Sequence, residues 1–159
     1  MNIRKATPAD EAVLHELVDE FSSEVPEPDD VGPEGWDDEW ASISRSFDGG
    51  AVYLAEDGDG ATGMAYALPP DRGRSHLQIV HVRQRARRRG VATALVLACV
   101  EEVKGHGARR ISLDVLHANP VARAVWQRLG FEEVAHVMAS SVEALEARLQ
   151  NAPLGVSRA

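Results

Sequence analysis

Apolar residues recur along the chain with two different periods, and these periods define the expected elements. A period of two predicts strands, and a period near 3.6 predicts helices. The predicted strands are residues 2–6, 51–55, 61–68, 75–82, 109–115 and 131–138. The predicted helices are residues 8–21, 36–47, 90–103, 120–129 and 141–150.

The order of these elements, β-α-α-β-β-β-α-β-α-β-α, predicts one α/β domain with a mixed sheet. The middle hairpins favour antiparallel pairing, whereas the late β-α-β unit predicts a parallel pair. The 159 residues have the size of one ordinary domain. We expect that domain to span residues 1–140, followed by a C-terminal helix over residues 141–150 and a disordered tail over residues 151–159.

Composition narrows the class of protein. No run reaches the roughly 18 uninterrupted apolar residues of a membrane-spanning helix. The first five residues are followed by polar positions rather than by the apolar core of a signal peptide. The single cysteine, Cys99, excludes an intrachain disulfide and is expected to be a small core residue. We therefore expect a cytoplasmic protein that binds no membrane and no metal.

Charge is distributed unevenly along the chain, whose net charge is −8. Residues 6–44 contain no Lys or Arg and hold 13 of the 25 acidic residues, whereas residues 83–89 contain five arginines. This pattern predicts two binding surfaces of opposite sign, or a solvated acidic face beside a solvated loop. Nucleic acid is not the expected partner, because the chain is acidic overall and no aromatic residues interleave with the arginines.

The densest chemistry lies where a predicted strand gives way to a helix, between Val82 and Gly90. Small residues, among them Ala92 and Thr93, stand at the start of that helix. Free backbone N–H groups at a helix N-terminus bind anions, and small side chains let a phosphate approach closely. The spacing is neither that of a P-loop nor Gly-x-Gly-x-x-Gly. The segment predicts a site for a ligand that carries a pyrophosphate.

Two motifs of this chain resemble those of the GNAT superfamily of N-acetyltransferases. The first, Arg/Gln-x-x-Gly-x-Gly/Ala between a strand and a helix, stands here as Arg87–Ala92. The second, an Asn followed by a helix that ends in Gly-Phe, runs here from Asn119 to Gly130 and Phe131. The order of elements matches from residue 2 to about residue 138. The resemblance implies a GNAT (acyl-CoA N-acyltransferase) fold, with a mixed central sheet bulged or splayed at its fourth strand and helices on both faces.

The resemblance also implies acetyl-CoA as cosubstrate. The splayed strand would pair its backbone with the pantetheine amides, the loop would hold the pyrophosphate on backbone N–H groups, and an Asn would position the pantetheine arm. Arginine side chains would contact the 3′-phosphate or the adenine. The cofactor-binding residues implied are Val80, His81, Val82, Arg87, Arg88, Arg89, Gly90, Val91, Ala92, Thr93 and Asn119.

Acetyl transfer needs a base for the amine and benefits from an acid for the departing thiolate. The family usually places that acid on a Tyr four residues before the Gly of Gly-Phe, where this chain has Trp126. An indole N–H only donates, so Trp126 either packs in the core or lines the acyl pocket, and His117 or Tyr66 would be the donor instead. The base is expected to be His76, on the same strand face as Val80, although a structural hydrogen bond would also explain it.

The acceptor and the assembly follow from the same resemblance. The acidic stretch over residues 24–39 lies where the family binds its acceptor, and it predicts a cationic amine of a small molecule or peptide. The family usually ends in two strands, but here the last predicted strand is followed by the helix at residues 141–150. The final strand is then absent, short or supplied by a partner chain, so that a homodimer is plausible.

Three functions fit the sequence. The leading one is an N-acetyltransferase that uses acetyl-CoA. The second is a catalytically impaired acyl-CoA-binding or sensor protein of the same fold, because Trp126 replaces the usual Tyr. The third is an acidic interaction domain without a CoA site. Thiol release with an amine separates the first from the second, and a CoA-induced rise in melting temperature separates both from the third.

Overall fold

Five strands form one sheet in the order β1-β2-β3-β4-β5, antiparallel from β1 to β4 and parallel between β4 and β5. The computed structural model describes residues 1–25, 35–116 and 118–151. The strands are β1 (Asn2–Lys5), β2 (Ala51–Asp57), β3 (Gly60–Ala67), β4 (Arg74–Val82) and β5 (Arg110–Ser112). The helices are η1 (Pro8–Asp10), α1 (Glu11–Glu24), α2 (Trp36–Ser46), η2 (Gln84–Ala86), α3 (Val91–Gly105), α4 (Pro120–Arg128) and α5 (Val142–Gln150). The predicted mixed sheet is confirmed.

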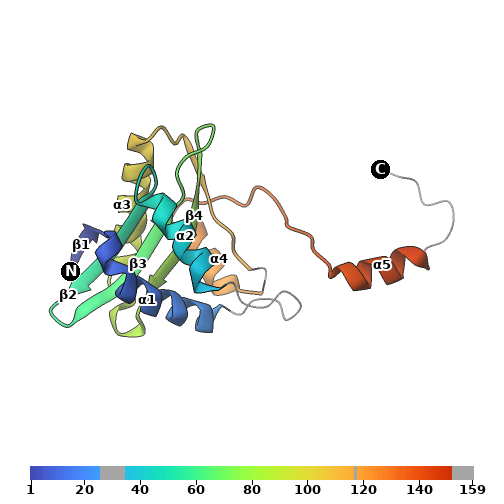
Figure 1. Ribbon diagram of the computed structural model, residues 1–159, viewed down its shortest axis with the longest axis horizontal. Coiled ribbons are helices and arrows are strands. Elements are labelled where there is room, and N and C mark those ends of the chain that lie inside the picture. Colours follow the sequence, from blue (N-terminus) through green and yellow to red (C-terminus); the bar gives the residue numbers. More distant parts are fainter. Residues whose placement is uncertain (26–34, 117, 152–159) are drawn as a thin grey trace.

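Helices cover both faces of this sheet, as Figure 1 shows. The core under α3 holds Leu95, Cys99 and Val103 against small sheet residues such as Ala65. The prediction for Cys99 is confirmed, because burial leaves its side chain fully inside and raises the pKa of its thiol to about 12. Such a thiol stays protonated at neutral pH and serves packing rather than chemistry.

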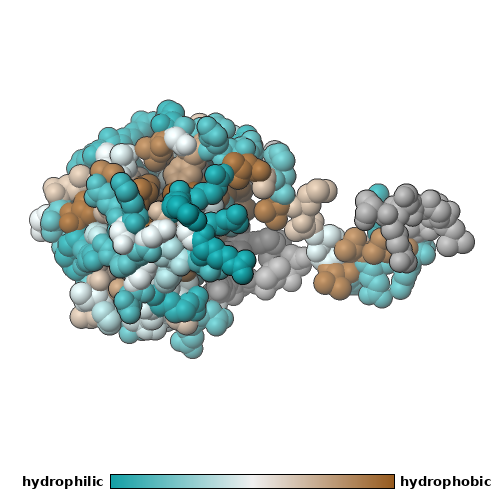
Figure 2. All heavy atoms as spheres, turned by 90° about the horizontal axis from the view of Figure 1, so that it is seen from above, coloured by the Kyte–Doolittle hydropathy of each residue, from teal (hydrophilic) through white to brown (hydrophobic). Residues whose placement is uncertain are grey.

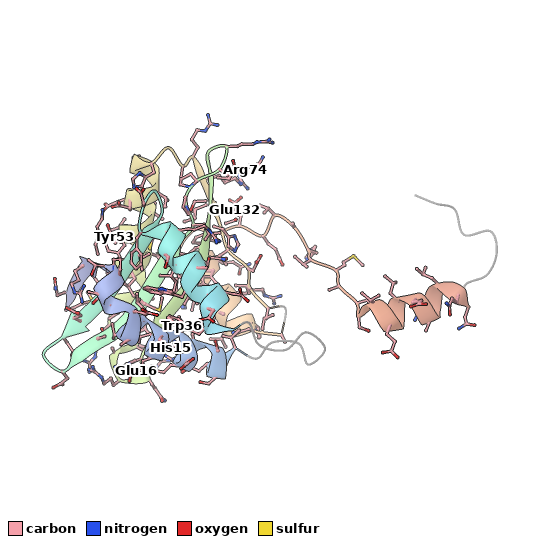
Figure 3. The ribbon with its side chains drawn as sticks, in the orientation of Figure 1. His15, Glu16, Trp36, Tyr53, Arg74 and Glu132 are labelled. Atoms are coloured by element: carbon pink, nitrogen blue, oxygen red, sulfur yellow. The ribbon has the colours of Figure 1, made fainter. Side chains whose placement is uncertain are left out.

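The opposite face is covered by α1 and α2. Leu14, Leu17 and Ile43 are fully buried in the core that these helices make with the sheet. The start of α2 is held to α1 by a ring stack, in which His15 lies on Trp36 with a centroid distance of 4.0 Å and an interplanar angle of 10° (Figure 3). This packing sets α1 beside β4, where the candidate site lies.

A β-bulge interrupts β4. Tyr66 of β3 pairs with Ile79, but the next residue of β3, Ala67, pairs with Leu77. Gln78 is therefore the extra residue on the bulged strand. A bulge bends the strand and increases its twist, and it reverses which face the following side chains occupy.

The bulge corrects one prediction about His76. Leu77 and Val82 share the core under α3, with Val80 packed against it, which strict alternation along β4 would forbid. Since neighbouring residues of a strand point to opposite faces, His76 lies on the face opposite Leu77 and Val80. The expectation that His76 and Val80 share a face is wrong, because the extra residue shifts the alternation between them.

The strands β4 and β5 separate soon after they meet. They pair at three positions, from Arg74 with Arg110 to His76 with Ser112. Beyond that point β4 continues to Val82, whereas β5, predicted over residues 109–115, ends at Ser112. The predicted splay at the fourth strand is present, and it leaves one edge of β4 open within the described chain.

The strand predicted over residues 131–138 does not form. These residues run as an extended segment from the end of α4 to α5, which stands apart from the rest of the domain (Figure 1). Val137 and Met138 are 88% and 93% exposed. Apolar atoms gather on this outlying part of the chain (Figure 2). A strand requires a neighbour for its backbone groups, and the described chain supplies none here.

Candidate active site

A cavity of about 240 Å³ lies at the point where β4 and β5 separate. The end of α1, the bulged part of β4, the segment after β5 and the start of α4 enclose it. Its walls are mainly apolar, with two carboxylates and two amides among them. The lining residues are Phe21, Glu24, Val25, Leu77, Gln78, Val80, Leu113, Asp114, Val115, Leu116, Asn119, Ala122 and Trp126.

The open edge of β4 faces this cavity. The N–H of Arg83 donates to a carbonyl of β3 at 2.8 Å, and successive residues direct their N–H and C=O groups to opposite edges of a strand. Val80 and Val82 therefore direct their backbone groups away from β3, toward the space that β5 has left. The carbonyl of His81 instead lies against Gly63 of β3. Of the three residues expected to pair with pantetheine, two have their backbone groups at the open edge.

The loop before α3 forms a concave set of backbone N–H groups. Arg88 has φ 62° and Gly90 has φ 78°, both in the left-handed region. The first α3 hydrogen bond runs from the N–H of Ala94 to the carbonyl of Gly90, so the N–H groups before it have no partner within the helix. A side chain built at Gly90 would meet nothing within 4 Å, which shows open space above the loop. Such a concavity at a helix N-terminus binds anions.

The five arginines of this loop divide into two groups. Arg83, Arg85 and Arg87 bind acidic side chains of the domain or its backbone carbonyls. Arg88 and Arg89 are exposed, and within residues 1–25, 35–116 and 118–151 no ion pair involves them. The sequence could not assign the arginines individually. The structure leaves these two side chains available to a phosphate.

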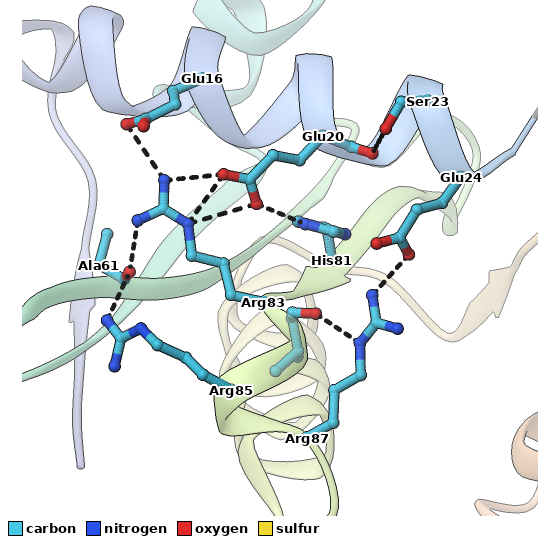
Figure 4. Close-up of polar contacts among 10 residues, drawn as sticks. Glu16, Glu20, Ser23, Glu24, Ala61, His81, Arg83, Arg85 and Arg87 are labelled. Atoms are coloured by element: carbon cyan, nitrogen blue, oxygen red, sulfur yellow. Dashed lines mark hydrogen bonds and ion pairs between the residues drawn. The ribbon is translucent and has the colours of Figure 1, made fainter.

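Glutamates of α1 hold the loop in place (Figure 4). Arg83 lies 2.9 Å from Glu20 and 3.1 Å from Glu16, and Arg87 lies 2.5 Å from Glu24. The three glutamates are four residues apart, so they share one face of α1. We call Glu16, Glu20 and Glu24 with their arginine partners the glutamate ladder. It was not predicted, because the spacing 16-20-24 is visible in the sequence but nothing local indicates that this face of α1 meets the arginines.

Glu20 has a second partner in His81, whose ring is 3% exposed and lies 3.1 Å from the Glu20 carboxylate. Burial raises the pKa of Glu20, but hydrogen bonds from His81 and Arg83 lower it more, and the net shift is downward. One carboxylate thus contacts both a buried imidazole and a guanidinium. His81 serves this packing with its side chain rather than facing the cavity.

Asn119 caps α4 and also lines the cavity. Its side-chain oxygen accepts a hydrogen bond from the N–H of Ala122 at 3.1 Å. Because the oxygen is used for the cap, the side-chain NH₂ remains as the donor for a ligand.

Trp126 belongs to both the core and the cavity. It packs against the core under α3, meets the ring of Phe131 edge to face at 5.7 Å, and lines the cavity. Trp126 therefore both packs in the core and lines the cavity, which were the two alternatives that the sequence left open. Its position allows contact with a ligand in the cavity.

His76 is not among the residues that line the cavity, but it contacts one of them. Its Nδ1 lies 2.9 Å from the hydroxyl of Ser112, and its Nε2 lies 3.5 Å from a carboxylate oxygen of Asp114. Asp114, which lines the cavity, was not singled out from the sequence. The structural hydrogen bond anticipated for His76 exists, and the imidazole reaches the cavity through Asp114.

The two alternative proton donors have different outcomes. His117 lies outside the described residues. Tyr66 is fully buried, and its hydroxyl donates to Glu39 of α2 and lies 3.3 Å from the hydroxyl of Ser42. This places Tyr66 in the α2 packing and not among the cavity-lining residues.

Over the described part of the chain, no group of three or more His, Cys, Asp or Glu side chains is placed to hold a metal ion. None of the described helices combines the length and apolarity needed to cross a membrane.

The sequence profile of the acetyltransferase (GNAT) family matches residues 11–131, which span both motifs and almost every element around the cavity. The chain belongs to this family. As a member it is an acyltransferase, and the fold implied by the resemblance is confirmed. A search of curated proteins finds no match.

Solved structures share the fold. An aminoglycoside N-acetyltransferase, AAC(6')-Iy, in complex with CoA is 23% identical, with a TM-score of 0.69 and coverage of 87% of this chain and 92% of that chain. A glucosamine-6-phosphate N-acetyltransferase from Arabidopsis thaliana is 17% identical, with a TM-score of 0.64 and coverage of 89% and 97%. A transcriptional regulator from Bacillus halodurans C-125 is 22% identical, with a TM-score of 0.66 and coverage of 87% and 97%.

The contacts of Glu20 within the glutamate ladder predict that the folded protein becomes less stable as the pH falls into the acid range. A carboxylate with a lowered pKa stabilises the fold above its ordinary pKa of about 4.3, and this stabilisation is lost as pH falls through the folded-state value. Glu20→Gln should lower the melting temperature at pH 7 and reduce its fall between about pH 5 and pH 3. Glu101→Gln, at an exposed position of α3, is the control. A Glu20→Gln curve parallel to that of the wild type would contradict the assignment.

Proposed function

We propose that the protein transfers the acetyl group of acetyl-CoA to a primary amine of a small cationic molecule or a peptide. The observation that carries this proposal is the succession along the chain of Val80, which lines the cavity, the open edge of β4 at Val82, and the loop before α3 with its left-handed residues. An extended ligand with a pyrophosphate at one end and a reactive thioester at the other fits such a path. The expected cytoplasmic location stays a prediction.

The residues divide along that path. Backbone N–H groups from Arg88 to Thr93 hold the pyrophosphate, and the exposed side chains of Arg88 and Arg89 bind the remaining phosphate charge. Val80 and Val82 pair with the pantetheine amides, and the NH₂ of Asn119 donates to the same arm. These roles are supported by the loop geometry and by the open edge of β4.

The acceptor amine enters the cavity beside carboxylates. Glu24 and Asp114 line it from α1 and from the segment after β5. Two carboxylates in a mainly apolar cavity favour a cationic amine and orient its ammonium group. The predicted acidic stretch continues over residues 26–34, which lie outside the described residues.

The reaction requires the amine to lose a proton before it attacks. We assign this step to Asp114 and His76, because Asp114 lines the cavity and His76 lies 3.5 Å behind it. The neutral nitrogen attacks the acetyl carbonyl, the carbon–sulfur bond breaks and the thiolate leaves, and the second proton of the nitrogen passes to the thiolate, which gives the amide and the free thiol of CoA. A thiol has an ordinary pKa near about 8.5, so the thiolate departs without a strong acid, which is consistent with Trp126 at this position.

A binding protein without catalysis is the alternative. Trp126 favours it, because an indole cannot supply the proton that the family's Tyr supplies. The same cavity and loop would then bind acyl-CoA as a signal. The two functions differ in one measurable product, the free thiol of CoA.

The first test is thiol release from acetyl-CoA with a panel of amines matched in size. We expect turnover with diamines and aminoglycoside-like amines, and much slower turnover with amino alcohols of equal length, because Glu24 and Asp114 bind a second positive charge that an amino alcohol lacks. Asp114→Asn should lower kcat/KM for the cations. Acetyl-CoA binding without thiol release for any amine would favour the binding protein, and equal turnover of amino alcohols and diamines at low salt would contradict the charge preference.

The second test concerns the base. His76→Ala should lower the acetylation rate by on the order of 10²-fold and flatten the rate profile between about pH 6 and pH 8, because general bases contribute about this much. The control is His106→Ala, which removes an exposed imidazole of the α3 end, away from the cavity. An unchanged profile in His76→Ala would remove His76 from the mechanism.

We also propose that the chain forms a homodimer through its C-terminal arm, defined as residues 131–150. The arm exposes apolar side chains, and β5 has an edge without a strand beside it in the described chain. Both features are carried by each copy, so a two-fold pair of chains buries both at once.

Light scattering tests this assembly. The wild type should be a dimer, and Met138→Lys combined with Val137→Lys should shift it toward monomer, because charges replace the apolar surface of the arm. Leu97→Lys is the matched control, since Leu97 is an exposed apolar residue of α3, outside the arm. A wild-type chain that stays monomeric at high micromolar concentration would contradict the proposal.

A further inference from the structure

Arg87 connects the two halves of the candidate site. Its Nε donates to the carbonyl of Val82 at 2.8 Å, and its Nη2 lies 2.5 Å from Oε2 of Glu24 (Figure 4). Val82 is on the open edge of β4, and Glu24 lines the cavity. The guanidinium of Arg87 thus binds both the Val82 carbonyl, which is expected to bind the cofactor, and the Glu24 carboxylate, which is expected to bind the acceptor.

The contact with Val82 stands where pantetheine would bind. An amide of the pantetheine arm that pairs with the edge of β4 needs a carbonyl acceptor, and the carbonyl of Val82 is directed to that edge. In the structure the guanidinium of Arg87 donates to this oxygen. A cofactor that takes the edge competes directly with Arg87.

The contact with Glu24 masks a charge in the cavity. While Arg87 is bound, the carboxylate of Glu24 is neutralised by a short ion pair and its attraction for an ammonium group is weakened. Both side chains are partly exposed, at 42% for Arg87 and 48% for Glu24. An ion pair of this exposure contributes little stability, so exchanging it for another cation costs little.

The contacts of Arg83 in the glutamate ladder do not depend on Arg87. Arg83 contacts Glu20, Glu16 and the carbonyl of Ala61 at once, whereas Arg87 has a single carboxylate. Movement of Arg87 therefore leaves α1 docked on the loop through Arg83.

We propose that Arg87 couples the two sites. Cofactor at the β4 edge displaces Arg87 from Val82, the Arg87–Glu24 pair breaks, and Glu24 becomes the carboxylate that binds the ammonium group of the acceptor. The inference rests on the proposed function and adds a specificity-determining residue, Glu24, whose availability depends on the cofactor. Because coupling between sites is reciprocal, a cationic acceptor also tightens cofactor binding.

Calorimetry with unreactive CoA and 1,4-diaminobutane measures this coupling. In the wild type, saturating CoA should tighten diamine binding by about fivefold, at the low end of the usual range for coupled sites, because the partly exposed ion pair that CoA breaks is weak. In Arg87→Gln, the diamine should bind the CoA-free protein as tightly as the CoA-saturated wild type, and CoA should add little. In Glu24→Gln, diamine binding should be weak with and without CoA.

Arg85→Gln is the matched control. It removes the same charge from the same loop, but Arg85 pairs with Asp57 and contacts neither Val82 nor Glu24. It should keep the wild-type coupling. Arg87→Lys keeps the charge and loses the planar donor fork, and its coupling should fall between the two.

The possible results distinguish a failure of the coupling through Arg87 from a failure of the proposed function. Wild-type coupling in Arg87→Gln, or wild-type diamine affinity in Glu24→Gln, would overturn the role of Arg87 while the proposed function stands. Failure of the wild-type protein to bind CoA at all would overturn the proposed function, and the coupling with it.

Discussion

The separation of β4 from β5 is the constraint on which the site depends. Parallel strands that stayed paired would close the sheet, and the cavity and the free edge of β4 would not exist. Three residue pairs join the strands before they part, and the bulge at Gln78 bends β4 at this point. Backbone groups left open at the edge of a sheet need partners. In the proposed function, the pantetheine arm of acetyl-CoA supplies these partners.

The loop beyond this edge carries five arginines, and their mutual repulsion would favour an open, disordered segment. Acidic side chains of α1 and β2 bind three of them. These ion pairs hold the loop against α1 and β2, whereas Arg88 and Arg89 are exposed. The acidic N-terminal third of the chain thus has a structural role besides the proposed binding of a cationic acceptor.

The loop before α3 and the cap of α4 could be predicted from the sequence. The motifs around Gly90 and Asn119 are local, so the turn and the cap depend on neighbouring residues. The glutamate ladder could not be predicted, since Glu20 and Arg83 are 63 residues apart and only packing brings them together. The bulge at Gln78 reversed the predicted face of His76 without any local signal. The strand predicted over residues 131–138 does not form, because the described chain offers its backbone groups no neighbouring strand.

A crystal structure of the protein with CoA tests the central claim most directly. The account predicts the pyrophosphate on the N–H groups of Arg88 to Thr93, the pantetheine arm along Val80 and Val82, and the guanidinium of Arg87 away from the Val82 carbonyl. CoA bound elsewhere, or bound along β4 with Arg87 still joined to Val82 and Glu24, would contradict it.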